Sequence, residues 1–156
     1  MKLLKPVKVL SIISIALSGT ATLIALTLCM KSDVVLNLMA GRNYSSGSVF
    51  PWDVVIPLLV YTVINLAFVV LVNSLKTGGY RVTGIVFAIV ILLNRFASLF
   101  MSPIANMVNA SRGVEYIAAH SVMTSAVSLL TSPLSMVSSA LLFFTCGMCI
   151  FVEYTR

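Results

Sequence analysis

The fold follows from the stretch between Val54 and Leu75, which reads VVIPLLVYTVINLAFVVLVNSL. It holds no charged side chain, and as a helix it is long enough to cross a hydrocarbon core about 30 Å thick, which takes about 20 residues. Lipid offers the backbone no hydrogen-bonding partner, so a spanning segment must bond its own N–H and C=O groups. An apolar run of this length is therefore predicted to be a membrane-spanning helix.

Three further apolar runs are similar in length and composition, and they cover residues 7–30, 82–101 and 134–152. Hydrophobic residues make up 60% of the chain and charged residues 9%, whereas a soluble domain carries roughly 25% charged residues. A chain with so few charges has too little polar surface to face water on all sides. We therefore expect an all-α integral membrane protein, a four-helix bundle that forms a single domain over residues 1–156.

The first run also has the look of a secretory signal peptide, because Lys2, Lys5 and Lys8 flank its start. The apolar region of a signal peptide spans only about 7–15 residues. The run from Val7 to Met30 is longer than that. The sequence therefore favours an uncleaved first helix that acts as a signal anchor.

The positions of lysine and arginine predict the orientation, since cytoplasmic segments carry an excess of these residues. With the N-terminus inside, the inner segments hold Lys2, Lys5, Lys8, Lys76, Arg81 and Arg156, and the outer segments hold Lys31, Arg42 and Arg112. Residues 76–81 then form a cytoplasmic turn and residues 31–53 an outer loop. Both termini of a cell-membrane protein are predicted to be cytoplasmic. The net charge of +6 suits anionic headgroups and is not taken to indicate nucleic-acid binding.

Residues 102–133, between the third and fourth runs, allow three interpretations. In the first, the last helix starts near Glu115, bends at Pro133 and projects beyond the membrane. In the second, residues 116–130 form an amphipathic helix in the outer interface. In the third, they enter the membrane as a re-entrant segment buried in protein. Pro103 is expected to end or kink the third helix. The fold class thus includes an extra amphipathic or extended helical segment before the last spanning helix.

Four polar residues form the candidate intramembrane polar site, namely Asn65, Asn94, Arg95 and His120. A charge near mid-membrane is costly, so Arg95 is expected to snorkel to the outer headgroups, to pair inside the bundle or to hold a ligand. Its candidate partners are Asn65, Glu115 and His120. Asn65 is expected to make an interhelical hydrogen bond. His120 has no His, Cys or carboxylate cluster near it in sequence, so no metal or cofactor site is predicted.

Small hydroxyl residues recur every four positions, a spacing that places them on one face of a helix. They are Ser14, Ser18 and Thr22 in the first run, and Ser121 with Ser125, Thr124 with Ser128 and Ser132, and Ser135 with Ser139 in the last third of the chain. Such faces let helix backbones approach closely, and the hydroxyls bond across the contact. Packing within the bundle is the favoured interpretation. A polar groove along a pathway and an interface with a partner helix are the alternatives.

No hydrolase, metalloprotease, P-loop or dinucleotide-binding signature is present. No loop cysteine accompanies the pair Cys146 and Cys149 in the last run, so an enzyme is not expected. Two function classes remain. The first is a non-catalytic accessory, assembly or interaction protein, whose partners are the lipid bilayer and other membrane subunits or further copies of itself. The second is a small oligomeric transporter or channel that uses Asn65, Arg95 and the hydroxyl stripe of the fourth helical segment.

Overall fold

The computed structural model describes residues 4–41, 49–75 and 78–152, and regular structure in this part of the chain is entirely helical. The elements are α1 (Leu4–Met30), α2 (Ser32–Ala40), α3 (Trp52–Ser74), α4 (Tyr80–Asn109), the short 3-10 turn η1 (Ala110–Arg112) and α5 (Val114–Val152). Four of the helices, α1, α3, α4 and α5, are long and apolar enough to cross a membrane. The all-α class is thus confirmed, together with the expected number of such helices.

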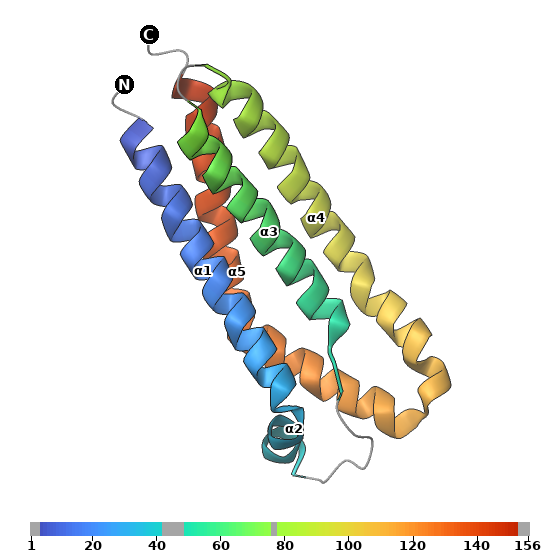
Figure 1. The fold of residues 1–156 in the computed structure, drawn as a ribbon. Helices are drawn as coiled ribbons and strands as arrows, with labels where there is room; N and C mark the ends of the chain where they lie inside the picture. Colours follow the sequence, from blue (N-terminus) through green and yellow to red (C-terminus); the bar gives the residue numbers. More distant parts are fainter. Residues whose placement is uncertain (1–3, 42–48, 76–77, 153–156) are drawn as a thin grey trace.

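The four long helices lie side by side, and each runs opposite in direction to the next along the chain (Figure 1). α1 and α4 each pack against both α3 and α5, so α1 and α4 occupy opposite corners of the bundle. α5 is long enough to contact every other helix, including α2. This arrangement brings the first and the last helix of the chain into direct contact.

The loop predicted over residues 31–53 is partly wrong, because the structure has a helix, α2, over Ser32–Ala40. Its apolar side chains Val35 and Leu36 pack on Ala119 and Met123 of α5. Gly41 ends α2 in the left-handed conformation (φ 60°) that glycine adopts without strain. Packing on α5, not the local sequence, accounts for this helix.

Of the three interpretations for residues 102–133, the structure has a last helix that begins at Val114 and continues unbroken through Pro133. Figure 1 shows the orange first part of α5 running from the lower end of α4 past the start of α3 toward α1, before the ribbon turns to run along the bundle. Pro103 does not end the third long helix, since α4 continues to Asn109. A proline removes one backbone donor, and neighbouring helices can compensate for it.

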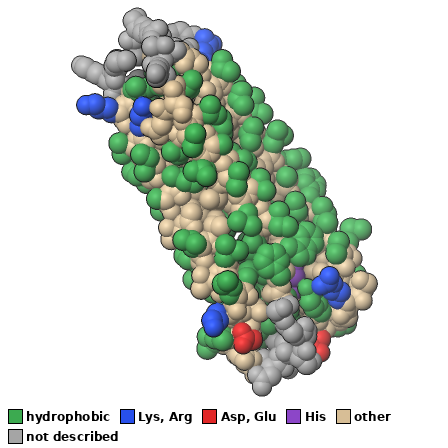
Figure 2. Space-filling model, viewed as in Figure 1, with side chains coloured by type: hydrophobic (Ala, Val, Ile, Leu, Met, Phe, Trp, Pro, Cys, Tyr) green, Lys and Arg blue, Asp and Glu red, His purple; other side chains and the backbone are tan. Residues whose placement is uncertain are grey.

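The two ends of the bundle differ in charge. At the end where α1 begins and α5 finishes, here called the basic end, α1 carries Lys5 and Lys8 and α4 carries Arg81. The opposite end, here called the mixed end, has residues of both signs, Lys31, Asp33, Arg112 and Glu115. In the space-filling view, blue and red side chains lie only near the two ends, with green and tan between them (Figure 2).

Buried apolar side chains fill the bundle toward the basic end, where we call them the basic-end cluster. Its members are Val7, Tyr61, Phe68, Val72, Tyr80, Ile91, Leu142, Cys146 and Cys149. Phe68 and Phe87 meet edge to face, with ring centroids 5.2 Å apart. α4 approaches α5 closely at Gly84, where an added Cβ would lie 2.6 Å from the carbonyl oxygen of Cys146. The interior of this half of the bundle is therefore tightly packed and apolar.

Candidate functional site

A buried amide lies at the contact of α1, α3 and α5. Asn65 has no exposed surface, and its Nδ2 donates to the Oγ atoms of Ser14 at 2.8 Å, Ser18 at 3.2 Å and Ser138 at 3.3 Å. The predicted interhelical hydrogen bond of Asn65 is thus present, with partners on two helices. Its Oδ1 is buried without a partner. This group, with Tyr61, is called the seam below.

Two serines of the seam bond each other's helix backbones. Ser14 Oγ donates to the carbonyl of Ser138 at 2.9 Å, and Ser138 Oγ donates to the carbonyl of Ser14 at 2.8 Å. Farther along the same face, Thr22 meets Thr62 of α3 at 2.8 Å between hydroxyl oxygens. Only small side chains allow such close contact between helix backbones. The hydroxyl stripe of the first helix therefore packs inside the bundle, as predicted.

Tyr61 connects the seam to a second polar region. Its hydroxyl lies 2.9 Å from Ser138 Oγ. The guanidinium carbon of Arg95 lies 5.0 Å from the centre of its ring, within cation–π range. One aromatic side chain of α3 thus touches the buried seam with its polar tip and the arginine of α4 with its face.

Arg95 turns into the bundle toward α5. Its Nη2 donates to the carbonyl of Ser135 at 2.9 Å and to the Oγ of Ser139. This is the pairing inside the bundle, and not the snorkelled arrangement, among the expected alternatives. The partners proposed from sequence were wrong, because Asn65, Glu115 and His120 are not among its contacts.

A partly enclosed pocket of about 220 Å³ lies between α3, α4 and α5. Arg95 and Asp53 are its charged lining residues, and Asn94, Ser98, Ser128, Thr131, Ser132 and Ser135 supply polar groups. The apolar wall comes from α3, with Val54, Pro57, Leu58 and Tyr61. The pocket therefore joins a hydroxyl-rich wall on α5 to an apolar wall on α3.

The pocket extends from the mixed end toward the middle of the bundle. Asp53 lies in the first turn of α3 and is 6% exposed. Tyr61 lies eight residues farther along α3, which is about 12 Å at 1.5 Å per residue. Since Arg95 sits over Tyr61, the carboxylate and the guanidinium mark opposite ends of the pocket.

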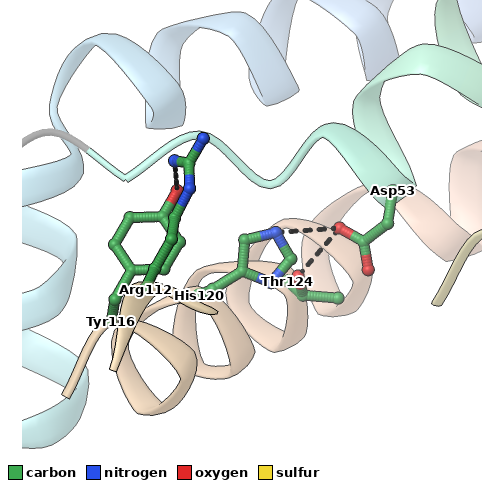
Figure 3. A network of polar contacts seen from close by, with 5 residues as sticks. All are labelled: Asp53, Arg112, Tyr116, His120 and Thr124. Carbon is green, nitrogen blue, oxygen red and sulfur yellow. Dashed lines mark hydrogen bonds and ion pairs between the residues drawn. The ribbon is translucent and has the colours of Figure 1, made fainter. Parts of the chain in front are cut away.

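A short polar network backs the Asp53 end of the pocket (Figure 3). Thr124 donates to Asp53 Oδ1 at 3.1 Å, and His120 Nε2 lies 3.5 Å from the same oxygen. The His120 contact has ion-pair distance but not hydrogen-bond geometry. Tyr116 stacks on His120 with ring centroids 6.3 Å apart, and Arg112 donates to the Tyr116 hydroxyl at 3.0 Å. The two partners of Asp53, His120 and Thr124, thus come from successive turns of α5.

The candidate polar residues thus divide among neighbouring regions. Asn94 and Arg95 line the pocket, His120 lies behind Asp53, and Asn65 belongs to the seam. Asp53, Tyr61 and Ser138 were not among the site residues predicted from the sequence. Ser138 carries a usable signal, since it follows Ser135 at helical spacing, but nothing in the sequence indicates that Asp53 faces α5 or that Tyr61 faces α4.

Comparisons with protein-family models, with curated proteins and with solved structures find no match for this chain.

Proposed function

We propose that this chain is a multi-pass protein of the cell membrane. Its helices α1, α3, α4 and α5 cross the membrane, and both termini lie on the cytoplasmic side. Support comes from the apolar surface between two charged ends (Figure 2). The basic end carries Lys5, Lys8 and Arg81, the bias expected of a cytoplasmic face. The mixed end, with Asp33 and Glu115 beside its basic residues, then faces outward.

We further propose that it acts as a non-catalytic accessory or assembly protein, through contacts in the plane of the membrane. The observation that carries this is the packing of the bundle interior. The basic-end cluster fills the cytoplasmic half, and the serine hydroxyls of the seam bond backbone carbonyls of the facing helix. A bundle closed in this way offers water and ions no polar route through its cytoplasmic half.

α4 is the helix that most needs a neighbour. In its most apolar stretch of 18 residues only 11% is buried inside the structure, whereas the corresponding stretches of α1, α3 and α5 are 28% to 33% buried. Its outward face presents Leu92, Leu93, Phe96, Leu99 and Phe100, all more than half exposed. Lipid solvates such a face, and a partner helix can replace that lipid through van der Waals packing. We take α4 as the surface for other membrane subunits or a further copy of the chain.

Site-specific photocrosslinking in intact membranes tests this proposal. A benzophenone amino acid at Leu93 of α4 is compared with the same residue at Leu23 of α1, because the two leucines are 62% and 66% exposed. We expect a discrete protein adduct from position 93 and only lipid adducts from position 23. Equal yields of protein adducts from both positions would contradict a partner surface on α4.

A small oligomeric transporter or channel is the second candidate, and the pocket with Arg95 and Asp53 is what favours it. Conduction would require the basic-end cluster to open. The purified chain alone in liposomes separates the two proposals. An accessory protein gives no solute flux above empty liposomes, whereas flux that Arg95→Gln abolishes would favour transport.

A further inference from the structure

Arg95 has no acidic partner in the part of the chain that the structure describes. Its contacts are the Ser135 carbonyl, the Ser139 hydroxyl and the Tyr61 ring, all of them uncharged. Both bonds use Nη2, so the donors on Nε and Nη1 remain for another group. A cation held within a bundle of apolar helices is strongly stabilised by a counter-charge. Two acceptors on α5 already fix one nitrogen of the guanidinium, and the remaining donors are those that a bound anion would need.

We propose that the pocket binds a small, water-soluble organic anion through a single carboxylate seated on Arg95. A guanidinium matches a carboxylate in shape, because its planar N–H groups donate to both carboxylate oxygens at once. Tyr61 holds the guanidinium from one side and the α5 acceptors fix its far nitrogen. The remaining donors therefore need little rearrangement to meet a ligand.

The other walls define the rest of the ligand. The α5 side supplies the hydroxyls of Ser128, Thr131 and Ser132, which suit a ligand with polar substituents. Asp53 at the far end of the pocket disfavours a second negative charge there. A site of about 220 Å³ is somewhat larger than the cavity of about 150 Å³ that encloses benzene. A hydroxylated monocarboxylate with fewer than about ten heavy atoms fits these limits.

Binding is tested with lactate, whose methyl group gives a clear signal in saturation-transfer NMR. The full chain is placed in phosphatidylcholine nanodiscs at constant ionic strength and titrated with lactate or with lactamide, the uncharged analogue of the same shape. We expect saturable transfer to lactate and at least about tenfold weaker binding of lactamide, since charge-assisted bonds are the stronger ones. Equal binding of the two probes would overturn the proposal without any mutation.

Variants then assign the binding to Arg95. Arg95→Gln is expected to weaken lactate binding at least about tenfold, and Arg95→Lys to weaken it less, because lysine keeps the charge but loses the planar fork. Arg81→Gln, on the same helix at the basic end, serves as the matched control and leaves lactate binding unchanged. Thermal unfolding in nanodiscs identifies variants that are misfolded. Lactate binding that survives Arg95→Gln in a folded protein would disprove the assignment.

A final arm separates a soluble anion from a lipid. Oleate carries the same carboxylate on a long acyl chain, and a pocket built for a whole small solute should not prefer it. We expect lactate to bind in the presence of oleate with little change in its saturation. If oleate binds while lactate gives no signal in the same nanodiscs, the site recognises a lipid headgroup and the proposal is overturned.

Discussion

At the residue scale, two asparagines of α3 differ in burial and in their hydrogen-bond partners. Asn65 is fully buried and bonds hydroxyls of α1 and α5, whereas Asn73 is exposed and bonds only the carbonyl of Val69, one turn back in α3. The first amide holds three helices together, and the second adds nothing between helices. This difference makes them a matched pair for measuring what the seam contributes to stability.

Replacing Asn65 with leucine should lower the free energy of unfolding by about 1 kcal/mol, since interhelical hydrogen bonds in membranes contribute about 0.6 kcal/mol on average. The loss stays modest because the hydroxyls of Ser14 and Ser138 continue to donate to each other's backbone carbonyls. SDS titration of the purified protein, followed by circular dichroism, measures the change.

Asn73→Leu is the control, with an expected change within about 0.5 kcal/mol, as for surface positions in general. A result in which both leucine variants unfold alike would mean that the seam does not stabilise the bundle.

Polar groups within an apolar run can be recognised from the sequence alone. Asn94 and Arg95 were selected because polar groups in an apolar run are costly, and both line the pocket. Asp53 was not selected, because its place at the edge of an apolar run looked ordinary. Its burial depends on α5 crossing over it with Thr124 and His120, a tertiary contact that no local pattern reveals.

At the element scale, Gly84 controls how closely α4 approaches α5. A Cβ at this position would meet the Cys146 carbonyl oxygen at 2.6 Å and the Cys149 Cβ at 3.0 Å. A carbonyl oxygen and a Cβ cannot move independently of their helix, so α4 and α5 must move apart to accept a side chain at position 84.

Gly84→Ala should therefore destabilise the protein by about 1–3 kcal/mol, the usual cost of overpacking. Gly147→Ala, beside Cys146 on α5, is the control, because nothing lies within 4 Å of a Cβ added there. Alanine is the better helix former, so this variant should be unchanged or more stable by up to about 1 kcal/mol. Thermal unfolding of both variants in one mild detergent tests this prediction. A Gly147→Ala variant that is less stable than Gly84→Ala would contradict the close contact between α4 and α5.

The long helices were predictable and the short one was not, for a physical reason. Runs such as 54–75 have only one backbone solution in lipid, whatever surrounds them. Residues 32–40 can adopt several backbone conformations. The helix α2 is favoured because Val35 and Leu36 pack on Ala119 and Met123 of α5. The same contact favours a last helix that begins as early as Val114.

At the scale of the whole molecule, the charge difference between the two ends predicts an orientation in the membrane. Ser74, at the basic end of α3, and Ser111, in η1 at the mixed end, are both exposed, so we expect cysteine to be accepted in their place. In a Cys29→Ser background, the remaining native cysteines, Cys146 and Cys149, are buried. An impermeant maleimide should label Ser111→Cys in intact cells, and Ser74→Cys only after permeabilisation. The opposite labelling pattern would invert the proposed topology.

The bonds between Ser14 and Ser138 join residues 124 positions apart in the chain. Ribosomes add about 5–20 residues per second, so on the proposed topology the nascent α1 would stay in the bilayer for roughly 6–25 s before its main neighbour is synthesised. During that interval α3 can cover part of this hydroxyl face through Asn65 and Thr62, but the Ser14 carbonyl lacks the donor that Ser138 later supplies. Chains truncated before α5 therefore leave the serine face of α1 incompletely bonded.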